Sequence, residues 1–106
     1  MIGAANVADV RLHPQARAEL IEAVRFYESR ARSLGREFLA EVRQVSSLLR
    51  DHPEAGAPYT GSTRRLILRR FPYTIIYTYR DAQIVVLAVA HQRRRPGYWQ
   101  ARAPTR

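Results

Sequence analysis

Two apolar runs near the C-terminus give the clearest pattern along this chain. The runs Tyr73 to Tyr79 and Ile84 to Ala90 are rich in β-branched and aromatic residues, and Arg80 to Gln83 separates them. Such a pattern predicts a β-hairpin. Alternation along the first strand places its odd-numbered residues, from Tyr73 to Tyr79, on one face and its even-numbered residues on the other. We expect the first face to lie in the core and the second to be half polar.

Helical spacing predicts an amphipathic helix that begins at Pro14. Proline is harmless in the first turn, where its missing N–H has no helical partner and its fixed φ suits helical backbone. Beyond Ala16, the apolar residues that recur every three to four positions are Leu20, Val24, Tyr27 and Ala31. We expect that stripe to face the core.

A second helix follows the interruption at Ser33-Leu34-Gly35. Its apolar stripe consists of Phe38, Val42, Val45 and Leu49. The residue before a proline is pushed out of the helical region, so we expect this helix to end before Pro53. The short link between the two helices predicts an antiparallel helical hairpin.

The remaining segments complete the predicted order of elements. Val7 to Leu12 alternates as in a short strand, and Arg64 to Arg70 is a further strand candidate. Asp51 to Thr63 is rich in turn-forming residues and predicts a loop, while Pro96-Gly97 turns the chain and residues 101–106 are expected to fray. The order is β-α-α-β-β-β. It predicts an α+β fold in which the helical hairpin packs on one face of an antiparallel sheet and the other face stays uncovered.

Length and composition limit the classes of protein that this chain can form. With 106 residues, of which 46% are hydrophobic, residues 1–106 are expected to form one domain. The chain contains no cysteine, which excludes disulfides and thiol chemistry. Its first ten residues lack a basic region and a long apolar core, and no run is long enough to span a membrane. We therefore predict a cytoplasmic protein with no membrane partner.

The charge is strongly positive, with a formal net charge of +9 and a pI of about 11.2. All 18 basic residues are arginine, whose guanidinium group binds phosphate and carboxylate in bidentate fashion, although codon bias also produces such a composition. Seven of them belong to strands or strand ends that should lie side by side: Arg64, Arg65, Arg69, Arg70, Arg93, Arg94 and Arg95. We expect them to converge at one edge of the sheet as a docking surface for an acidic partner; a solvated rim is the alternative.

Three residues near these arginines are candidates for chemistry. His91 ends the last strand, and histidine, which titrates near neutral pH, can act as a general base or can simply be hydrogen-bonded in a structural role. Tyr98 and Trp99 follow a turn, where they can stack on a partner or plug the sheet. His13 and His52 have no companion at metal-ligand spacing, so we expect no metal and no cofactor.

Motifs in most of the chain carry a family resemblance. They are Leu34-Gly35 with Phe38-Leu39 and Val42, the run Arg65 to Leu68, Phe71-Pro72-Tyr73 with Ile75 and Tyr77, and finally Val89, His91, Arg93-Arg94, Pro96 and Trp99. With these motifs the sequence resembles the RelE/ParE superfamily of toxins from bacterial type II toxin–antitoxin modules. The resemblance implies one of two activities. RelE-type members are ribosome-dependent endonucleases that cut mRNA in the A site, whereas ParE-type members share the fold and poison DNA gyrase.

Departures from the nuclease pattern favour the ParE-like branch. The nucleases carry an arginine directly after the first tyrosine of a Tyr-Arg-x-x-Tyr strand, where this chain has Thr74. Their two alternating lysines on the preceding strand correspond to Arg65 and Ile67, and arginine is a poor proton shuttle. A second catalytic arginine falls on Gln92, or on Arg93 with one gap.

The resemblance and the charge together predict a ParE-like toxin that poisons DNA gyrase. We expect an acidic, partly disordered antitoxin to fold onto the groove between the helical hairpin and the sheet. The alternatives are a ribosome-dependent mRNA endonuclease and a nucleic-acid-binding module without toxicity. If the chain is a nuclease, the candidate catalytic residues are His91, Arg93, Tyr98 and Arg65. The residues expected to contact the target are Arg69, Arg70, Arg93, Arg94, Arg95, Tyr98 and Trp99.

Overall fold

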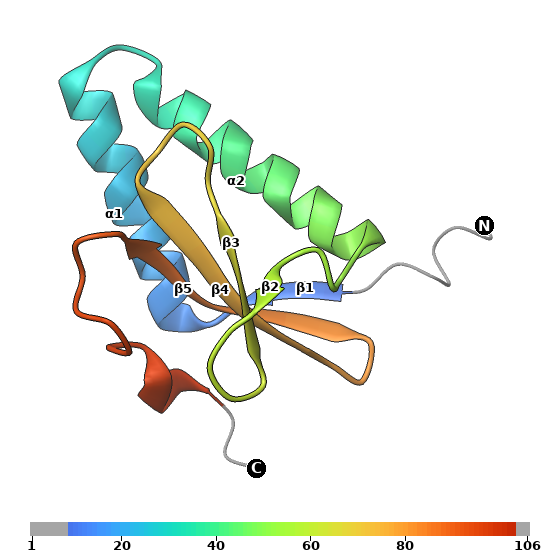
Figure 1. Ribbon diagram of the computed structural model, residues 1–106. Coiled ribbons are helices and arrows are strands. Elements are labelled where there is room, and N and C mark those ends of the chain that lie inside the picture. Colours follow the sequence, from blue (N-terminus) through green and yellow to red (C-terminus); the bar gives the residue numbers. More distant parts are fainter. Residues whose placement is uncertain (1–8, 104–106) are drawn as a thin grey trace.

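The computed structural model describes residues 9–103 and combines two helices with one five-stranded sheet (Figure 1). The elements in chain order are β1 (Asp9–Leu12), α1 (Pro14–Arg30), α2 (Leu34–Asp51), β2 (Ala57–Pro58), β3 (Thr63–Ile67), β4 (Tyr73–Arg80), β5 (Gln83–His91) and the short 3-10 helix η2 (Gln100–Arg102). The strands lie in the order β1-β5-β4-β3-β2. The predicted α+β class, element order and helical hairpin are confirmed; the expected start of the first strand at Val7 lies outside the described residues.

The sheet is mixed, so the prediction of a purely antiparallel sheet is wrong in one respect. β1 runs parallel to β5, with Asp9 opposite Gln83 and Leu12 opposite Val86, while every other pair is antiparallel. A tight turn fixes an antiparallel direction, and β1 is joined to β5 by no turn. The alternating pattern in the sequence therefore predicted the strand β1 but not its direction relative to β5.

Two boundaries on the other side of the sheet also differ from expectation. The predicted loop contains the two-residue edge strand β2, which pairs with Arg64 and Arg65 of β3. β3 ends at Ile67, and the turn before β4 therefore contains Arg69 and Arg70. A proline ends β2, as is common on an edge strand, where a missing N–H costs no ladder bond.

Local capping explains where the helices begin and end. α1 starts at Pro14 as predicted, and the Nδ1 atom of His13 accepts a hydrogen bond of 3.1 Å from the Gln15 N–H. α1 stops at Arg30 because Ala31 is extended, which leaves Ala31 off the buried stripe. A side chain of α1 caps the start of α2. The carboxylate of Glu28 accepts hydrogen bonds from the backbone N–H groups of Ser33 and Gly35, at 2.9 and 3.0 Å.

The main core lies between the helical hairpin and one face of the sheet, as Figure 1 shows. The predicted α2 stripe is buried there, from Phe38 to Leu49, and so are Tyr73, Ile75 and Tyr77 of β4. Phe38 is at the centre of an aromatic group, with ring centroids 5.0–5.4 Å from those of Tyr27, Phe71 and Tyr73. The periodic residues of the sequence thus build the helix-covered face.

A β-bulge changes the pattern on the opposite face of the sheet. β4 and β5 pair Ile76 with Ala88 and Tyr77 with Val86, so Leu87 is an extra residue without a partner on β4. Leu87 and Ala88 consequently both belong to a second apolar cluster, together with Ile76, Ala90 and Trp99. The face expected to stay uncovered is therefore partly covered by residues 92–103, which we call the C-terminal segment.

Candidate functional site

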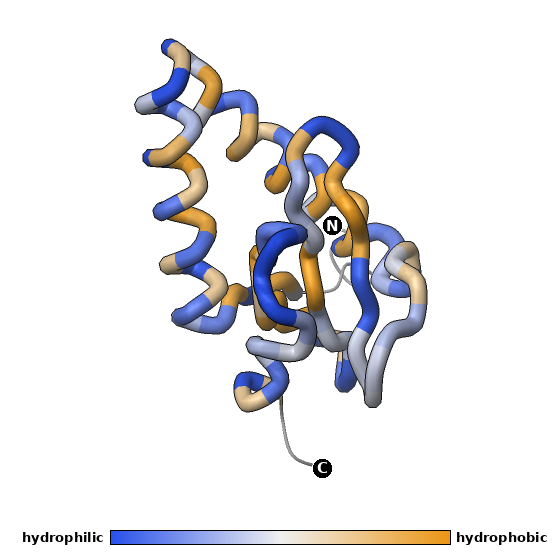
Figure 2. Tube along the Cα trace, turned by 60° about the vertical axis from the view of Figure 1, so that its left-hand side comes forward, coloured by the Kyte–Doolittle hydropathy of each residue, from blue (hydrophilic) through white to orange (hydrophobic). Residues whose placement is uncertain are grey.

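The seven arginines expected at one edge occupy separate places. Figure 2 shows two distinct hydrophilic stretches, the turn between β3 and β4 and the loop that follows β5. Arg69 and Arg70 belong to the first stretch, and Arg93, Arg94 and Arg95 belong to the second. Both lie at one end of the sheet, since β4 begins opposite the end of β5, but their side chains make different contacts.

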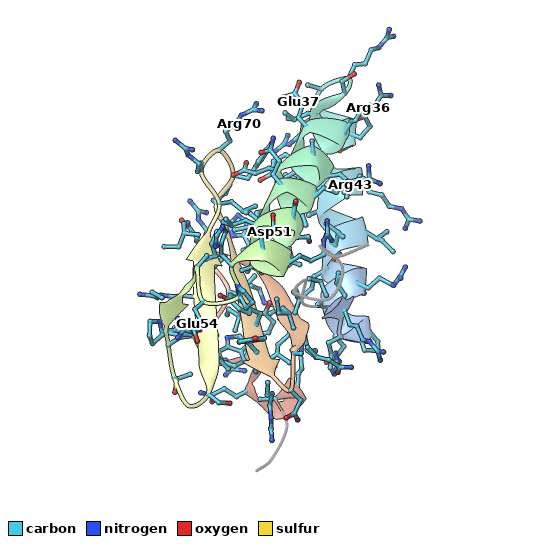
Figure 3. The ribbon with its side chains drawn as sticks, turned by 90° about the vertical axis from the view of Figure 1, so that its right-hand side faces the viewer. Arg36, Glu37, Arg43, Asp51, Glu54 and Arg70 are labelled. Carbon is cyan, nitrogen blue, oxygen red and sulfur yellow. The ribbon has the colours of Figure 1, made fainter. Side chains whose placement is uncertain are left out.

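The arginines of the β3–β4 turn bind to α2. Glu41 accepts hydrogen bonds from the backbone N–H groups of Arg69 and Arg70, at 2.6 and 3.4 Å. The Nη2 atom of Arg70 lies 2.9 Å from the carboxylate of Glu37, and both residues appear at the same end of α2 in Figure 3. Two carboxylates of α2 therefore balance the charge of this turn and hold it against the helix.

Arg64 and Arg65 point to opposite sides of β3, as neighbours on a strand must. The Nη1 atom of Arg64 donates hydrogen bonds to the carbonyls of Gly56, at 2.7 Å, and Glu54, at 3.2 Å, and so fixes the loop before β2. Arg65 faces the second side of the sheet, where its guanidinium stacks 4.6 Å from the ring centroid of Tyr59. Of these two arginines, only Arg65 lies on the second face of the sheet.

A groove of about 260 Å³ crosses the second face of the sheet beside the C-terminal segment. We call it the open-face groove. Ile67, Thr74, Ile76 and Ala90 contribute apolar or uncharged lining from β3, β4 and β5, and Ile67 is 54% exposed. The residues that complete its lining are Tyr59, Arg65, His91, Gln92, Arg94, Arg95, Pro96, Gly97, Tyr98 and Trp99. None of these lining residues is acidic, so the lining itself carries a net positive charge.

Aromatic rings orient two of the arginines that line the open-face groove. Arg65 stacks on Tyr59, and Arg94 lies over the ring of Tyr98, with its guanidinium carbon 3.8 Å from the centroid. Within residues 9–103, no carboxylate forms an ion pair with Arg65 or Arg95. Stacked guanidinium groups keep their N–H edges free for a carboxylate or phosphate. The groove therefore presents ordered cationic groups above an apolar floor.

Trp99 takes the packing role that the sequence left as one of two interpretations. Its side chain is only 2% exposed and packs in the second apolar cluster beside Ile76 and Leu87. Its ring centroid lies 6.0 Å from that of Tyr59. Trp99 thus fixes the C-terminal segment to the sheet and offers little surface for contact with a target.

Tyr98 has its hydroxyl group tied to α1. The hydroxyl donates a hydrogen bond of 2.8 Å to Glu19, and burial, reinforced by this hydrogen bond and by the charge of the carboxylate, raises the pKa of Tyr98 to about 12. The phenol therefore stays protonated near neutral pH, and its proton is already shared with a carboxylate. That arrangement suits a fixed wall of the groove better than an acid–base residue.

His91 stands between the open-face groove and a second hollow against α1. Its Nδ1 atom accepts a hydrogen bond of 3.0 Å from the Arg93 N–H, and its ring packs edge-on against Tyr73, with centroids 5.0 Å apart. Because Nδ1 is an acceptor, the neutral ring carries its proton on Nε2. His91 then offers a hydrogen-bond donor to a ligand rather than a base.

The expected fraying of the C-terminus is wrong for the residues that the structure describes there. Gln100–Arg102 form η2, and Arg102 donates hydrogen bonds to Glu19, at 2.9 Å, and to the Leu87 carbonyl, at 3.0 Å. Sequence reasoning missed both Glu19 and Arg102. They are 83 positions apart, and no local pattern signals a contact over that separation.

Comparison with known proteins identifies the family. Residues 10–96 match the family described as the ParE toxin of the type II toxin–antitoxin system parDE. The chain belongs to the ParE toxin family. A solved structure described as the chromosomal ParDE TA system from P. aeruginosa resembles the ParE-family chain with a TM-score of 0.67 and 17% identity, over 81% of this chain and 97% of that chain. At this identity the likeness concerns the fold, and no curated protein sequence matches.

No group of three or more His, Asp or Glu side chains among residues 9–103 is arranged to hold a metal ion. In the same part of the chain, neither helix combines the length and the apolar content that a membrane-spanning helix needs.

Proposed function

We propose that this ParE-family chain inhibits DNA gyrase and is neutralised by an acidic antitoxin. Family membership supports gyrase as the target, because the ParE-type branch is the one that the sequence resembles most. The observation that carries the choice over RNA cleavage is the uncharged floor of the open-face groove, where Ile67 lies opposite Thr74. These are positions at which the resemblance to nucleases would require charged side chains.

The chemistry of phosphodiester cleavage supports the same choice. An enzyme that cuts RNA must stabilise charge at the phosphate and move a proton from the attacking hydroxyl. Thr74 and Ile67 carry no charge, and the hydroxyl of Tyr98 keeps its proton and donates it in a hydrogen bond to Glu19. His91 presents a protonated Nε2 in its neutral form. The groove can hold an anion, but it lacks a free proton acceptor beside one.

We assign the contact with the target to Arg94 and Arg95, with Arg65, Arg93 and Tyr98 at the margins of the same surface. Arg95 is exposed and lines the groove. Such a patch attracts an acidic surface over the range of a Debye length and orients it on arrival. Arg69 and Arg70 were also expected to contact the target. Their backbone N–H groups hold the turn against α2, the guanidinium of Arg70 is paired with Glu37, and Trp99 is buried.

We place the antitoxin on the helical side, as the sequence predicted. A hollow of about 290 Å³ lies between α1 and the ends of β4 and β5, lined in part by Ala23, Phe26 and Tyr73. Phe26 is 47% exposed, and the guanidinium of Arg30 lies 5.0 Å from its ring centroid. An acidic segment that folds on binding can place an apolar side chain in this hollow and its carboxylates beside the arginine.

Purified protein tests the proposal directly. We expect it to block supercoiling of relaxed plasmid by gyrase, to accumulate linear plasmid after denaturation of the complex, and to leave mRNA intact on translating ribosomes. Arg95→Gln should weaken the inhibition, whereas Arg43→Gln, the same charge change on the exposed side of α2 (Figure 3), should not. Unhindered supercoiling together with A-site cleavage that is lost in His91→Ala would establish the nuclease instead. Salt-sensitive binding to naked nucleic acid without growth arrest would indicate a non-toxic binding module.

A further inference from the structure

One edge of β5 is covered by a strand over half its length and by side chains over the rest. β1 pairs with β5 up to Val86, whose carbonyl accepts a hydrogen bond from the His13 N–H. Beyond that point, the Val89 N–H donates to the Oε1 atom of Glu19, at 2.9 Å, and the Leu87 carbonyl accepts from the Nη1 atom of Arg102. Leu87 is the extra residue of the bulge. Two side chains thus bind backbone groups that a longer β1 would otherwise bind.

The carboxylate of Glu19 connects this edge to the C-terminal segment. Oε1 is used by Val89, while Oε2 accepts from the Tyr98 hydroxyl, at 2.8 Å, and from the Nη2 atom of Arg102, at 2.9 Å. Arg94 completes the group, with its Nη1 atom 4.0 Å from Oε2. The side chains of Glu19 and Arg102 are only 13% and 11% exposed. One nearly buried carboxylate therefore accepts hydrogen bonds from one backbone donor and two side-chain donors and forms a longer ion pair with Arg94.

Two members of this group, Arg94 and Tyr98, belong to one wall of the open-face groove. The ring of Tyr98 contacts two guanidinium groups, with Arg94 at 3.8 Å and Arg102 at 5.0 Å from its centroid. Arg94 and Tyr98 both line the groove, whereas Glu19 belongs to α1 and approaches from the helical side of the sheet. The carboxylate of Glu19, on the helix-covered side of the sheet, therefore holds the cationic side chain of Arg94 on the open face.

We propose that Glu19 is a positioning residue that orients Arg94 and Tyr98 for contact with the target. This inference rests on the proposed function, because it concerns the surface that we assign to the target. Without the negative charge, the guanidinium groups of Arg94 and Arg102 lie close to the same ring with no carboxylate to balance them, and they repel. Trp99 does not depend on Glu19, because its contacts are with the apolar cluster of Ile76, Leu87 and Ala88. Loss of the charge should therefore disorder the wall of the groove while the C-terminal segment stays docked.

The test replaces Glu19 by glutamine in the full chain and uses Glu22→Gln as the matched control. Glu22 is an exposed residue of the same helix, and the two substitutions change the net charge equally. We expect E19Q to require about tenfold more protein than wild type for half-maximal gyrase inhibition, the factor typical of one lost charge-assisted hydrogen bond. E22Q should behave as wild type. Equal inhibition by E19Q and wild type would overturn the proposal.

Two spectroscopic measurements separate positioning from a purely structural role. Trp99 is the only tryptophan, so its emission maximum and its quenching by acrylamide report whether the C-terminal segment is docked. The Nε–H signal of Arg94 in a heteronuclear NOE experiment reports whether that side chain is ordered. We expect E19Q to keep Trp99 buried and to make Arg94 mobile. Exposure of Trp99 in E19Q, or an Arg94 signal as ordered as in wild type, would refute the positioning role.

A milder variant decides the question if E19Q does not fold. Tyr98→Phe removes only the hydroxyl bonded to Glu19, and we expect it to weaken inhibition by about threefold, in line with one lost hydrogen bond. Wild-type inhibition and wild-type order of Arg94 in this variant would overturn the proposal. If the unmodified protein fails to inhibit gyrase, the proposed function fails, while the Arg94 and Trp99 measurements still decide whether Glu19 orders the groove wall.

Discussion

The two faces of the sheet are built in different ways. The helix-covered face is closed by periodic apolar residues of α1, α2 and the strands, with Phe38 among the aromatic rings at its centre. The open face is closed in part by Trp99 and by the side-chain network around Glu19. The first face is closed mainly by apolar packing, with the hydroxyl of Tyr77 hydrogen-bonded inside it, whereas the second depends on a buried charge pair.

This difference separates stability from recognition. A face made of apolar packing can lose one polar contact and still fold, and most of its residues are buried. A face held by charged side chains has less apolar area, but it presents ordered guanidinium groups to solvent. We infer that the helix-covered face provides most of the folding free energy, and we propose that the open face provides the contact surface. The predictions below test this division.

The largest loss of stability is expected from Phe38→Ala. Phe38 is fully buried and contacts three other aromatic rings, so its removal leaves a cavity in the main core. We expect the free energy of unfolding to fall by about 3–5 kcal/mol. Denaturant unfolding followed by circular dichroism measures it, with Phe26→Ala on the exposed side of α1 as the control. If the free energy of unfolding fell no more in Phe38→Ala than in Phe26→Ala, the inference that the helix-covered face provides most of the folding free energy would be wrong.

A smaller loss is expected from Tyr77→Phe, which removes one buried hydroxyl from the helix-covered face. That hydroxyl accepts a hydrogen bond from the Gly56 N–H, at 2.9 Å, and donates one to the Pro53 carbonyl, at 2.7 Å. Its loss leaves a buried backbone donor without its partner, which costs about 1–3 kcal/mol. The exposed Tyr79→Phe is the matched control in the same denaturant experiment. Equal stabilities of the two variants would show that the loop before β2 does not depend on this hydroxyl.

The smallest effect concerns the cap between the helices and depends on pH. Hydrogen bonds from the backbone N–H of Ser33, and more weakly from that of Gly35, lower the pKa of Glu28 below its ordinary value of 4.5. A lowered pKa means that ionised Glu28 stabilises the fold above pH 4.5, and this stabilisation is lost as the pH falls through the folded pKa. Glu28→Gln should therefore lower the melting temperature at pH 7, with a difference from wild type that narrows below pH 4.5. A difference that does not change with pH, or an equal one in Glu22→Gln, would contradict the capping role.

Periodicity predicted the helix-covered face because that face is made of periodic contacts. The stripe of α2, the start of α1 at Pro14 and the inward residues Tyr73, Ile75 and Tyr77 follow from spacing alone. The direction of β1 could not be predicted, since no turn links it to β5. The bulge at Leu87 was also invisible, because an extra residue in an apolar run leaves the composition of that run unchanged.

The candidate site was predicted only in outline. Charge indicated a cationic end of the sheet, and the C-terminal loop does contribute Arg94 and Arg95 to the open-face groove. Sequence could not separate these residues from Arg70, because that separation depends on which carboxylate each guanidinium meets in space. The role of Glu19 could not be predicted for the same reason. In the sequence it looks like any exposed glutamate of an amphipathic helix, and only the fold brings its partners to it.

One charge reversal on each arginine cluster tests the central claim most directly. Inhibition of gyrase supercoiling should be compared for Arg95→Glu, in the open-face groove, and Arg70→Glu, in the turn bound to α2. We expect Arg95→Glu to abolish inhibition, and we expect Arg70→Glu, if it remains folded, to inhibit like wild type. Full inhibition by Arg95→Glu together with its loss in a folded Arg70→Glu protein would instead place the target at the turn bound to α2.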